Sequence, residues 1–171
     1  MAKVGLFFGS DEGNTQRVAG LIAGCLGEAN VDIFDIADVT QAEFDDYDKI
    51  ILGISTWDFG QIQSDWEEFW DDVTEIDFSG KTVALYGLGD QFGYGDFFVD
   101  AMGMLHDIVI SNGAAVVGYW PVDGYNFDAS KALLADGKHF AGLAIDEDQQ
   151  PELTEARVKE WADSIRDAMG V

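Results

Sequence analysis

The chain has 171 residues, 47% hydrophobic and 25% charged, a composition typical of one globular domain over residues 1–171. Its 33 acidic and 9 basic residues give a formal net charge of -24, so we expect no nucleic-acid partner. Apolar sequence begins at Lys3 and no apolar run is long enough to span a bilayer, which predicts a cytoplasmic protein without membrane contact.

Apolar runs typical of buried strands alternate along the chain with amphipathic helical segments. Residues 3–9 are nearly all apolar, and residues 15–27 then repeat apolar side chains on one helical face. That face includes Cys25, the single cysteine, which we expect to be a small buried hydrophobe. In chain order the patterns predict strands at 3–9, 31–36, 49–55, 81–87 and 114–119, and helices at 15–27, 97–111 and 154–169, with a further helix opened by a Ser-x-x-Glu capping box at Ser64 to Glu67.

The alternating pattern breaks between residues 119 and 142, and a short apolar run then resumes at 143–146. Strands this apolar cannot expose either face to solvent, so the sheet that they form needs helices on both sides. The sequence therefore predicts an α/β fold, a three-layer doubly wound sandwich with a five-stranded parallel sheet and an insertion in the last strand. In such a sheet ligands bind beyond the carboxyl ends of the strands, so the loops after strands one, three and four are the candidate site.

The loop after the first strand combines small residues with hydroxyl groups and leads directly into a helix. Small residues let the backbone fold closely around a ligand, and the N–H groups of a helix start attract phosphate. The same residue types cap ordinary strand-to-helix turns, so this loop alone does not distinguish the two roles. The candidate phosphate-binding residues are Ser10, Asp11, Glu12, Gly13, Asn14 and Thr15.

The loops after the third and fourth strands each carry an aromatic side chain, Trp57 and Tyr94. A lone loop aromatic usually packs on its own domain, but two on neighbouring loops, about 7 Å apart, can sandwich one flat heterocycle. A phosphate at one end and a flat ring at the other describe a mononucleotide. The candidate residues on these two loops are Ser55, Thr56, Trp57, Asp58, Phe59 and Gly60, and Leu88, Gly89, Asp90 and Tyr94.

Sequence blocks along nearly the whole chain resemble flavodoxins, among them GSDEGNT, STWDFGQIQSDWEEF, GLGDQFGYGDFFVDA and GLAIDEDQQ. Because it has the 119–142 insertion, the chain is similar to the long-chain subgroup. The resemblance implies one non-covalently bound FMN, with its phosphate in the 10–15 loop and its isoalloxazine ring between Trp57 and Tyr94. It also implies that the pyrimidine edge of the ring meets Asp90 and the backbone near Gly89 and Val99. Asp146 would face the ribityl chain.

The resemblance further implies a low-potential one-electron carrier without a substrate of its own, whose FMN cycles between semiquinone and hydroquinone. The peptide joining Asp58 and Phe59 would turn toward flavin N5. Neither aromatic loop contains Lys or Arg, so the anionic hydroquinone would be poorly stabilised and its potential low. Flavodoxins usually have threonine at the position of Glu12, and some members have lysine at the position of Asn14. Both departures remove help for a phosphate dianion and weaken the expected hold on phosphate.

The expected partners are basic-surfaced redox proteins, namely a flavodoxin reductase as electron donor and an acceptor enzyme. The carrier is expected to be a monomer whose acidic surface attracts these partners by electrostatic steering. The acidic surface is equally compatible with solubility in a salty cytoplasm. One alternative function is an FMN-dependent NAD(P)H quinone reductase, but Trp57 and Tyr94 would block both faces of the flavin. The other is a cofactor-free receiver domain, which needs an aspartate at the end of strand three, where Ser55 and Thr56 stand.

Overall fold

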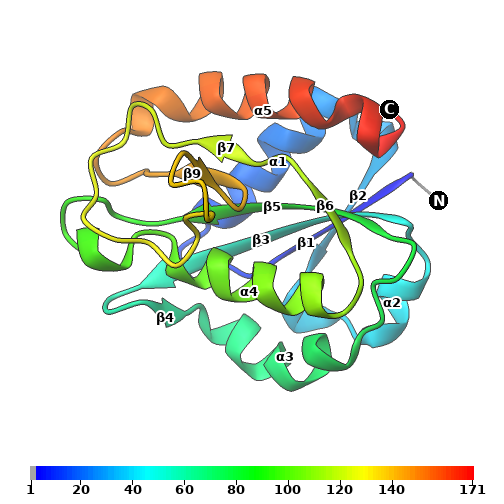
Figure 1. Ribbon diagram of the computed structural model, residues 1–171. Coiled ribbons are helices and arrows are strands. Elements are labelled where there is room, and N and C mark those ends of the chain that lie inside the picture. The colour runs from blue at the N-terminus through cyan, green and yellow to red at the C-terminus, as the bar shows by residue number, and fades with distance from the viewer. Residues whose placement is uncertain (1–2) are drawn as a thin grey trace.

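A parallel sheet with the strand order β2-β1-β3-β5-β6 forms the centre of the computed structural model, which describes residues 3–171 (Figure 1). Met1 and Ala2, part of the expected 1–171 domain, lie outside the described residues. The central strands β1, β3 and β5 are rich in Val, Ile, Leu and Phe and are buried almost throughout, as strands covered on both faces must be. The main strands are β1 (Val4–Phe8), β2 (Val31–Asp35), β3 (Lys49–Trp57) and β5 (Thr82–Leu88).

Helices cover both faces of this sheet. In Figure 1, α1 (Asn14–Leu26) and α5 (Thr154–Met169) lie on one side, and α3 (Ser64–Glu75) and α4 (Asp100–Ser111) lie on the other. This arrangement confirms the three-layer doubly wound sandwich. Short elements not expected from the sequence are α2 (Gln41–Asp45) and the 3-10 helices Glu28–Asn30, Ile36–Asp38, Gly95–Phe97 and Pro151–Leu153.

The last strand is divided in two by the insertion, as predicted. β6 (Ala115–Val117) pairs in parallel with the first half of β5, and β9 (Leu143–Ile145) pairs in parallel with the second half. Within the insertion, β7 (Trp120–Pro121) pairs antiparallel with β8 (His139–Phe140). A further two-residue strand, β4 (Gln61–Ile62), pairs antiparallel with the end of β3.

Three local predictions were wrong in detail. The helix α3 is capped by Gln63, whose side chain accepts a hydrogen bond from the Trp66 N–H, because the Ser64 hydroxyl instead donates to Asp11 at 2.8 Å. The helix expected from residue 97 begins at Asp100, because the preceding residue, Val99, has a left-handed backbone. Cys25 packs against the core but is only half-buried.

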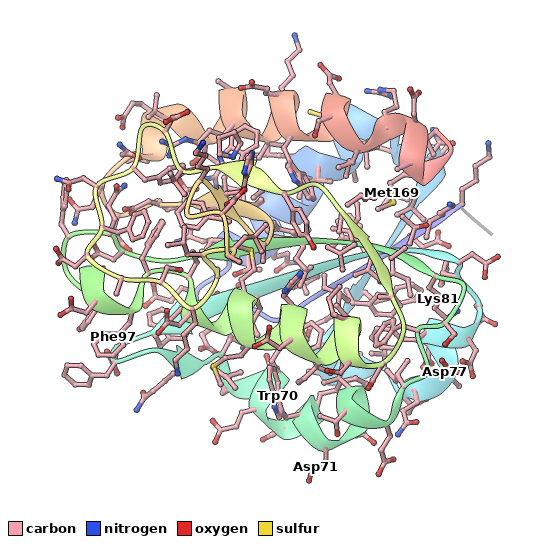
Figure 2. The ribbon with its side chains drawn as sticks, in the orientation of Figure 1. Trp70, Asp71, Asp77, Lys81, Phe97 and Met169 are labelled. Carbon is pink, nitrogen blue, oxygen red and sulfur yellow. The ribbon has the colours of Figure 1, made fainter. Side chains whose placement is uncertain are left out.

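The two ends of the sheet differ in what surrounds them. Phe97 lies at the end where the strands finish and Lys81 at the opposite end (Figure 2), where Figure 1 also places the last residues of the chain. There the Lys3 ammonium donates to the carbonyl of Gly170 at 3.0 Å. None of the helices in the described part of the chain is long and apolar enough to cross a membrane.

Candidate functional site

A cleft of about 290 Å³ opens at the carboxyl end of the sheet. It is formed by the loops that follow β1, β3 and β5, as predicted, and by the loop that follows β9. This is the edge at which open α/β sheets bind ligands. The lining residues are Ser10, Glu12, Asn14, Thr15, Ser55, Thr56, Trp57, Asp58, Leu88, Gly89, Asp90, Tyr94, Glu147 and Asp148.

One end of the cleft is the turn between β1 and α1. The Gly13 N–H donates to the Ser10 hydroxyl at 2.9 Å, and Gly13 itself has a φ of +89°, a conformation that glycine adopts without steric penalty. The hydroxyls of Thr15 and Ser55 share a buried hydrogen bond of 2.6 Å that ties this turn to β3. No side chain of the described residues caps α1, so its first N–H groups are open to an anion.

The other end of the cleft is walled by Trp57 and Tyr94. The Trp57 Nε1–H is shielded from solvent and has no hydrogen-bond acceptor among residues 3–171. Tyr94 is 40% exposed, and the Asp58 carboxylate, together with a hydrogen bond to it, raises the pKa of the Tyr94 phenol. Phe59 is 73% exposed and packs edge-on against Tyr94, with 6.1 Å between ring centroids.

Backbone strain is concentrated beside this aromatic end. Asp58 and Val99, with φ values of 45° and 48°, are the non-glycine residues of the described chain that have positive φ. This conformation is unusual for any L-residue, and for a β-branched one it is a true outlier that surrounding contacts must maintain. Gly89 lies against this strained segment, since a Cβ built there would be 3.1 Å from the Val99 nitrogen.

The loop after β9 brings two acidic residues to the cleft that the sequence did not single out, Glu147 and Asp148. The sequence pointed instead to Asp146, which is fully buried and does not line the cleft. Asp146 Oδ2 accepts hydrogen bonds from the Gln91 backbone and side chain, and Oδ1 accepts from the backbones of Asp148 and Gln149. Asp146 therefore organises the loop that presents its two neighbours.

The cleft is strongly acidic. Burial, followed by the carboxylates of Asp90, Asp146 and Glu12, raises the pKa of Asp148. Glu147 is paired with the Arg17 guanidinium, which lies one turn into α1 and does not line the cleft. No Lys or Arg is among the lining residues, so Asp148, Asp90 and Glu12 face no positive charge from the cleft wall itself.

Five further residues predicted from the sequence lie beside the cleft without lining it. Gly13 shapes the first turn, Phe59 extends the rim, and Val99 is fully buried behind Gly89. Asp11 accepts hydrogen bonds from Gln63 and Ser64, and with Gly60 it lines a second groove on the other side of Trp57. Among residues 3–171 no group of three or more His, Cys, Asp or Glu side chains is arranged to hold a metal ion.

A doubly wound α/β sheet, an uncapped helix start and two aromatic walls at its carboxyl edge define the class of mononucleotide-binding α/β proteins. Comparison with known protein families narrows this class to one family. Residues 6–161 match the Flavodoxin family, and the chain belongs to that family.

Close relatives extend over nearly the full length of the chain. Flavodoxin 1 of Escherichia coli is 50% identical over 169 residues, covering 99% of this chain and 96% of the relative, and a flavodoxin of Haemophilus influenzae is 52% identical over 169 residues, covering 99% and 97%. The crystal structure of Fusobacterium nucleatum flavodoxin bound to flavin mononucleotide superimposes with a TM-score of 0.90 at 32% identity, covering 98% of this chain and 99% of that one.

Proposed function

We propose that the cleft binds FMN without a covalent bond and that the protein, as a single unit over residues 1–171, is a low-potential one-electron carrier rather than an enzyme. The observation that carries the proposal is the pair of aromatic walls, Trp57 and Tyr94, set at the same sheet edge as the uncapped start of α1. A flat heterocycle and a phosphate need this combination. The FMN-bound Fusobacterium relative, which has the same fold, supports it.

The residues present fit FMN at both ends. Ser10, Asn14, Thr15 and the first N–H groups of α1 would hold the phosphate, and Trp57 and Tyr94 would flank the ring. The shielded Trp57 Nε1–H lacks an acceptor within the described chain, and a buried donor of this kind is normally satisfied. A polar ligand in the cleft is one source of that acceptor.

Bound FMN supplies the one-electron chemistry, and the protein tunes it. The acidic residues around the cleft oppose any added negative charge. One carboxylate about 10 Å away through water contributes roughly 0.4 kcal/mol of repulsion, so four contribute about 1.6 kcal/mol before salt screening. At about 59 mV per 1.4 kcal/mol for one electron, this lowers the potential of the second reduction step by about 70 mV.

The same charge favours basic-surfaced redox partners, and we propose a flavodoxin reductase as donor and a separate acceptor enzyme. A net charge of -24 produces a field that speeds the approach of a basic surface. The exposed Phe59 and Tyr94 leave the rim of the ring end open for contact. We further propose that the carrier is monomeric and works in the cytoplasm, where its unpaired Cys25 would stay reduced.

Calorimetric titration of the apoprotein with FMN, FAD and riboflavin tests the proposed ligand. We expect FMN to bind tightest, because the cleft offers a phosphate site at only one end. Anaerobic titration with a reductant should then show two separate one-electron steps, without turnover of a quinone when NAD(P)H alone is added. Rapid quinone reduction by NAD(P)H would favour the enzyme alternative, and failure to bind FMN would overturn the proposal.

A further inference from the structure

An ion pair between Arg17 of α1 and Glu147 of the loop after β9 joins these two segments beside the cleft. We propose that this pair compensates charge at the phosphate side of the site, and that Arg17 thereby favours phosphorylated flavin over riboflavin. The inference rests on the proposed FMN-binding function and assigns it a specificity-determining residue. Arg17 does not line the cleft itself, but its partner Glu147 does.

Arg17 lies where a helix least favours a cation. Its backbone N–H donates to the Gly13 carbonyl at 2.9 Å, the bond that opens α1. The positive end of the helix dipole repels a guanidinium in this turn. Arg17 is also the only Arg or Lys between Lys3 and Lys49 in the sequence. Its unfavourable position is offset by a charge from outside the helix, and Glu147 supplies that charge.

The Glu147 carboxylate is held on two sides. Its side chain is only 9% exposed, and the buried Thr154 hydroxyl donates to its Oε2 at 3.0 Å. Its Oε1 is shielded from solvent, and Arg17 is the partner that the structure gives it within residues 3–171. A buried carboxylate without an opposite charge is strongly unfavourable. Arg17 therefore allows Glu147 to be charged in the cleft wall.

The position of the pair makes its effect specific to phosphate. Among the carboxylates that line the cleft, Glu147 is the one that forms an ion pair within the described chain. Arg17 belongs to the same helix start as Asn14 and Thr15, which would hold the phosphate. A phosphate dianion there is attracted by Arg17 and repelled by Glu147. Riboflavin has no phosphate, so neither charge should alter its binding.

The experiment measures FMN and riboflavin affinities of Arg17→Gln, with Arg166→Gln as the matched control. The Arg166 side chain is 38% exposed against 48% for Arg17, pairs with Asp163, and donates to the Cys25 carbonyl at the far end of α1. We expect Arg17→Gln to weaken FMN binding about fivefold at low salt and less at high salt. Riboflavin binding to Arg17→Gln, and FMN binding to Arg166→Gln, should change less than about twofold.

Glu147→Gln tests the other member of the pair. The amide keeps the shape of the side chain and can still accept the Thr154 hydroxyl, but it removes the negative charge. FMN affinity should rise about threefold at low salt, because Arg17 then acts on the phosphate unopposed. The double variant Arg17→Gln/Glu147→Gln should return to within about twofold of wild type. Arg17→Lys, which keeps the charge, should also stay within about twofold.

Urea denaturation of the apoproteins provides a second measurement that needs no flavin. Arg17→Gln leaves a buried carboxylate without its opposite charge, whereas Glu147→Gln leaves a half-exposed cation that water can solvate. The unfolding midpoint should therefore fall more in Arg17→Gln than in Glu147→Gln, and the double variant should recover most of the loss. An unchanged midpoint in Arg17→Gln would show that the pair does not form in solution and would overturn the inference.

The affinities also contain the results that would contradict the inference. Equal losses of FMN and riboflavin binding in Arg17→Gln would assign Arg17 a structural role, and equal losses of FMN binding in Arg17→Gln and Arg166→Gln would assign the effect to net charge. Wild-type protein that binds no FMN would overturn the proposed function itself. Wild-type binding with unaltered FMN affinity in Arg17→Gln overturns only the role of Arg17.

Discussion

At the phosphate end of the cleft, residues 10–15 form one turn between β1 and α1, whereas the ring end is assembled from residues 56–60, residues 88–99 and the insertion. The first end is one continuous segment with a local bond from Gly13 to Ser10, and bonds from Thr15 to Ser55 and from Ser64 to Asp11 anchor it to the rest of the fold. The second depends on contacts between segments far apart in the sequence and contains both strained residues, Asp58 and Val99. Changes within the turn should therefore act mainly on phosphate binding, whereas the ring end should also respond to changes made at a distance.

The largest effect is expected at the ring end from Trp57→Ala and Tyr94→Ala. Loss of either stacking surface should weaken FMN binding by about 1 to 3 kcal/mol, by analogy with aromatic stacking on nucleic-acid bases. The second one-electron potential should rise, because the ring gains access to water. Fluorescence titration and potentiometry measure the two quantities.

Phe92→Ala is the matched control for these variants. Phe92 is an exposed aromatic residue of the same loop as Tyr94, but it does not line the cleft. Its removal should leave affinity and potential unchanged. Equal losses in Phe92→Ala and Tyr94→Ala would mean that the loop, rather than the ring contact, determines binding.

Thr15→Val tests the bond that joins the phosphate end to β3. The variant removes one buried hydroxyl and leaves the Ser55 hydroxyl without this partner, which should lower the free energy of unfolding by about 1 to 3 kcal/mol. FMN affinity should fall while both flavin potentials remain unchanged, because the ring lies at the other end. Chemical denaturation and potentiometry check this, and a shifted potential would show that the two ends are coupled.

Glu12→Thr should strengthen FMN binding at the phosphate end of the cleft. Glu12 lines the cleft, and its carboxylate repels a phosphate dianion, whereas a hydroxyl can donate a hydrogen bond of about 0.5 to 1.5 kcal/mol. We expect tighter FMN binding at low salt, a smaller gain at high salt and little change in the two flavin potentials. Glu28→Thr, which removes the same charge beyond the far end of α1, is the control. An equal gain in both variants would assign the effect to net charge alone.

Asp148→Asn should give the smallest change, seen in the pH dependence of binding. The pKa of Asp148 is already raised above 3.8, and a bound phosphate dianion would raise it further, so binding takes up protons. Relative to Asp148→Asn, the wild-type protein should therefore lose FMN affinity, by less than about tenfold, as pH rises from about 4 to 6. Riboflavin, which lacks the phosphate, should show no difference between the two proteins.

Most of the fold and most of the cleft were predictable from the sequence, because both depend on local patterns. Apolar runs and helical periodicity identified the main strands, the main helices and the site of the insertion. The turn at residues 10–15 and the aromatic residues Trp57 and Tyr94 were found because each directly follows a recognisable strand. Parallel strands then bring these loops to one edge.

The features that the sequence did not predict depend on distant partners. Which carboxylate after β9 faces the cleft is decided by the four N–H groups that bind Asp146, two of them from Gln91. The cap of α3 differs because Asp11 binds the Ser64 hydroxyl, and α4 starts late because Val99 is left-handed. None of these three features can be recognised from the residues of its own segment alone.

The divided strand also has a consequence for how the chain can be shortened. On β5, Ala84 pairs with Val117 and Tyr86 pairs with Leu143, so only Leu85 lies between the two halves. A single residue linking Val117 to Leu143 would therefore restore one continuous strand in the present register. An excision that keeps one residue of 118–142 as this link would therefore close the sheet without the insertion, and a lineage or a designer could make that change in one step.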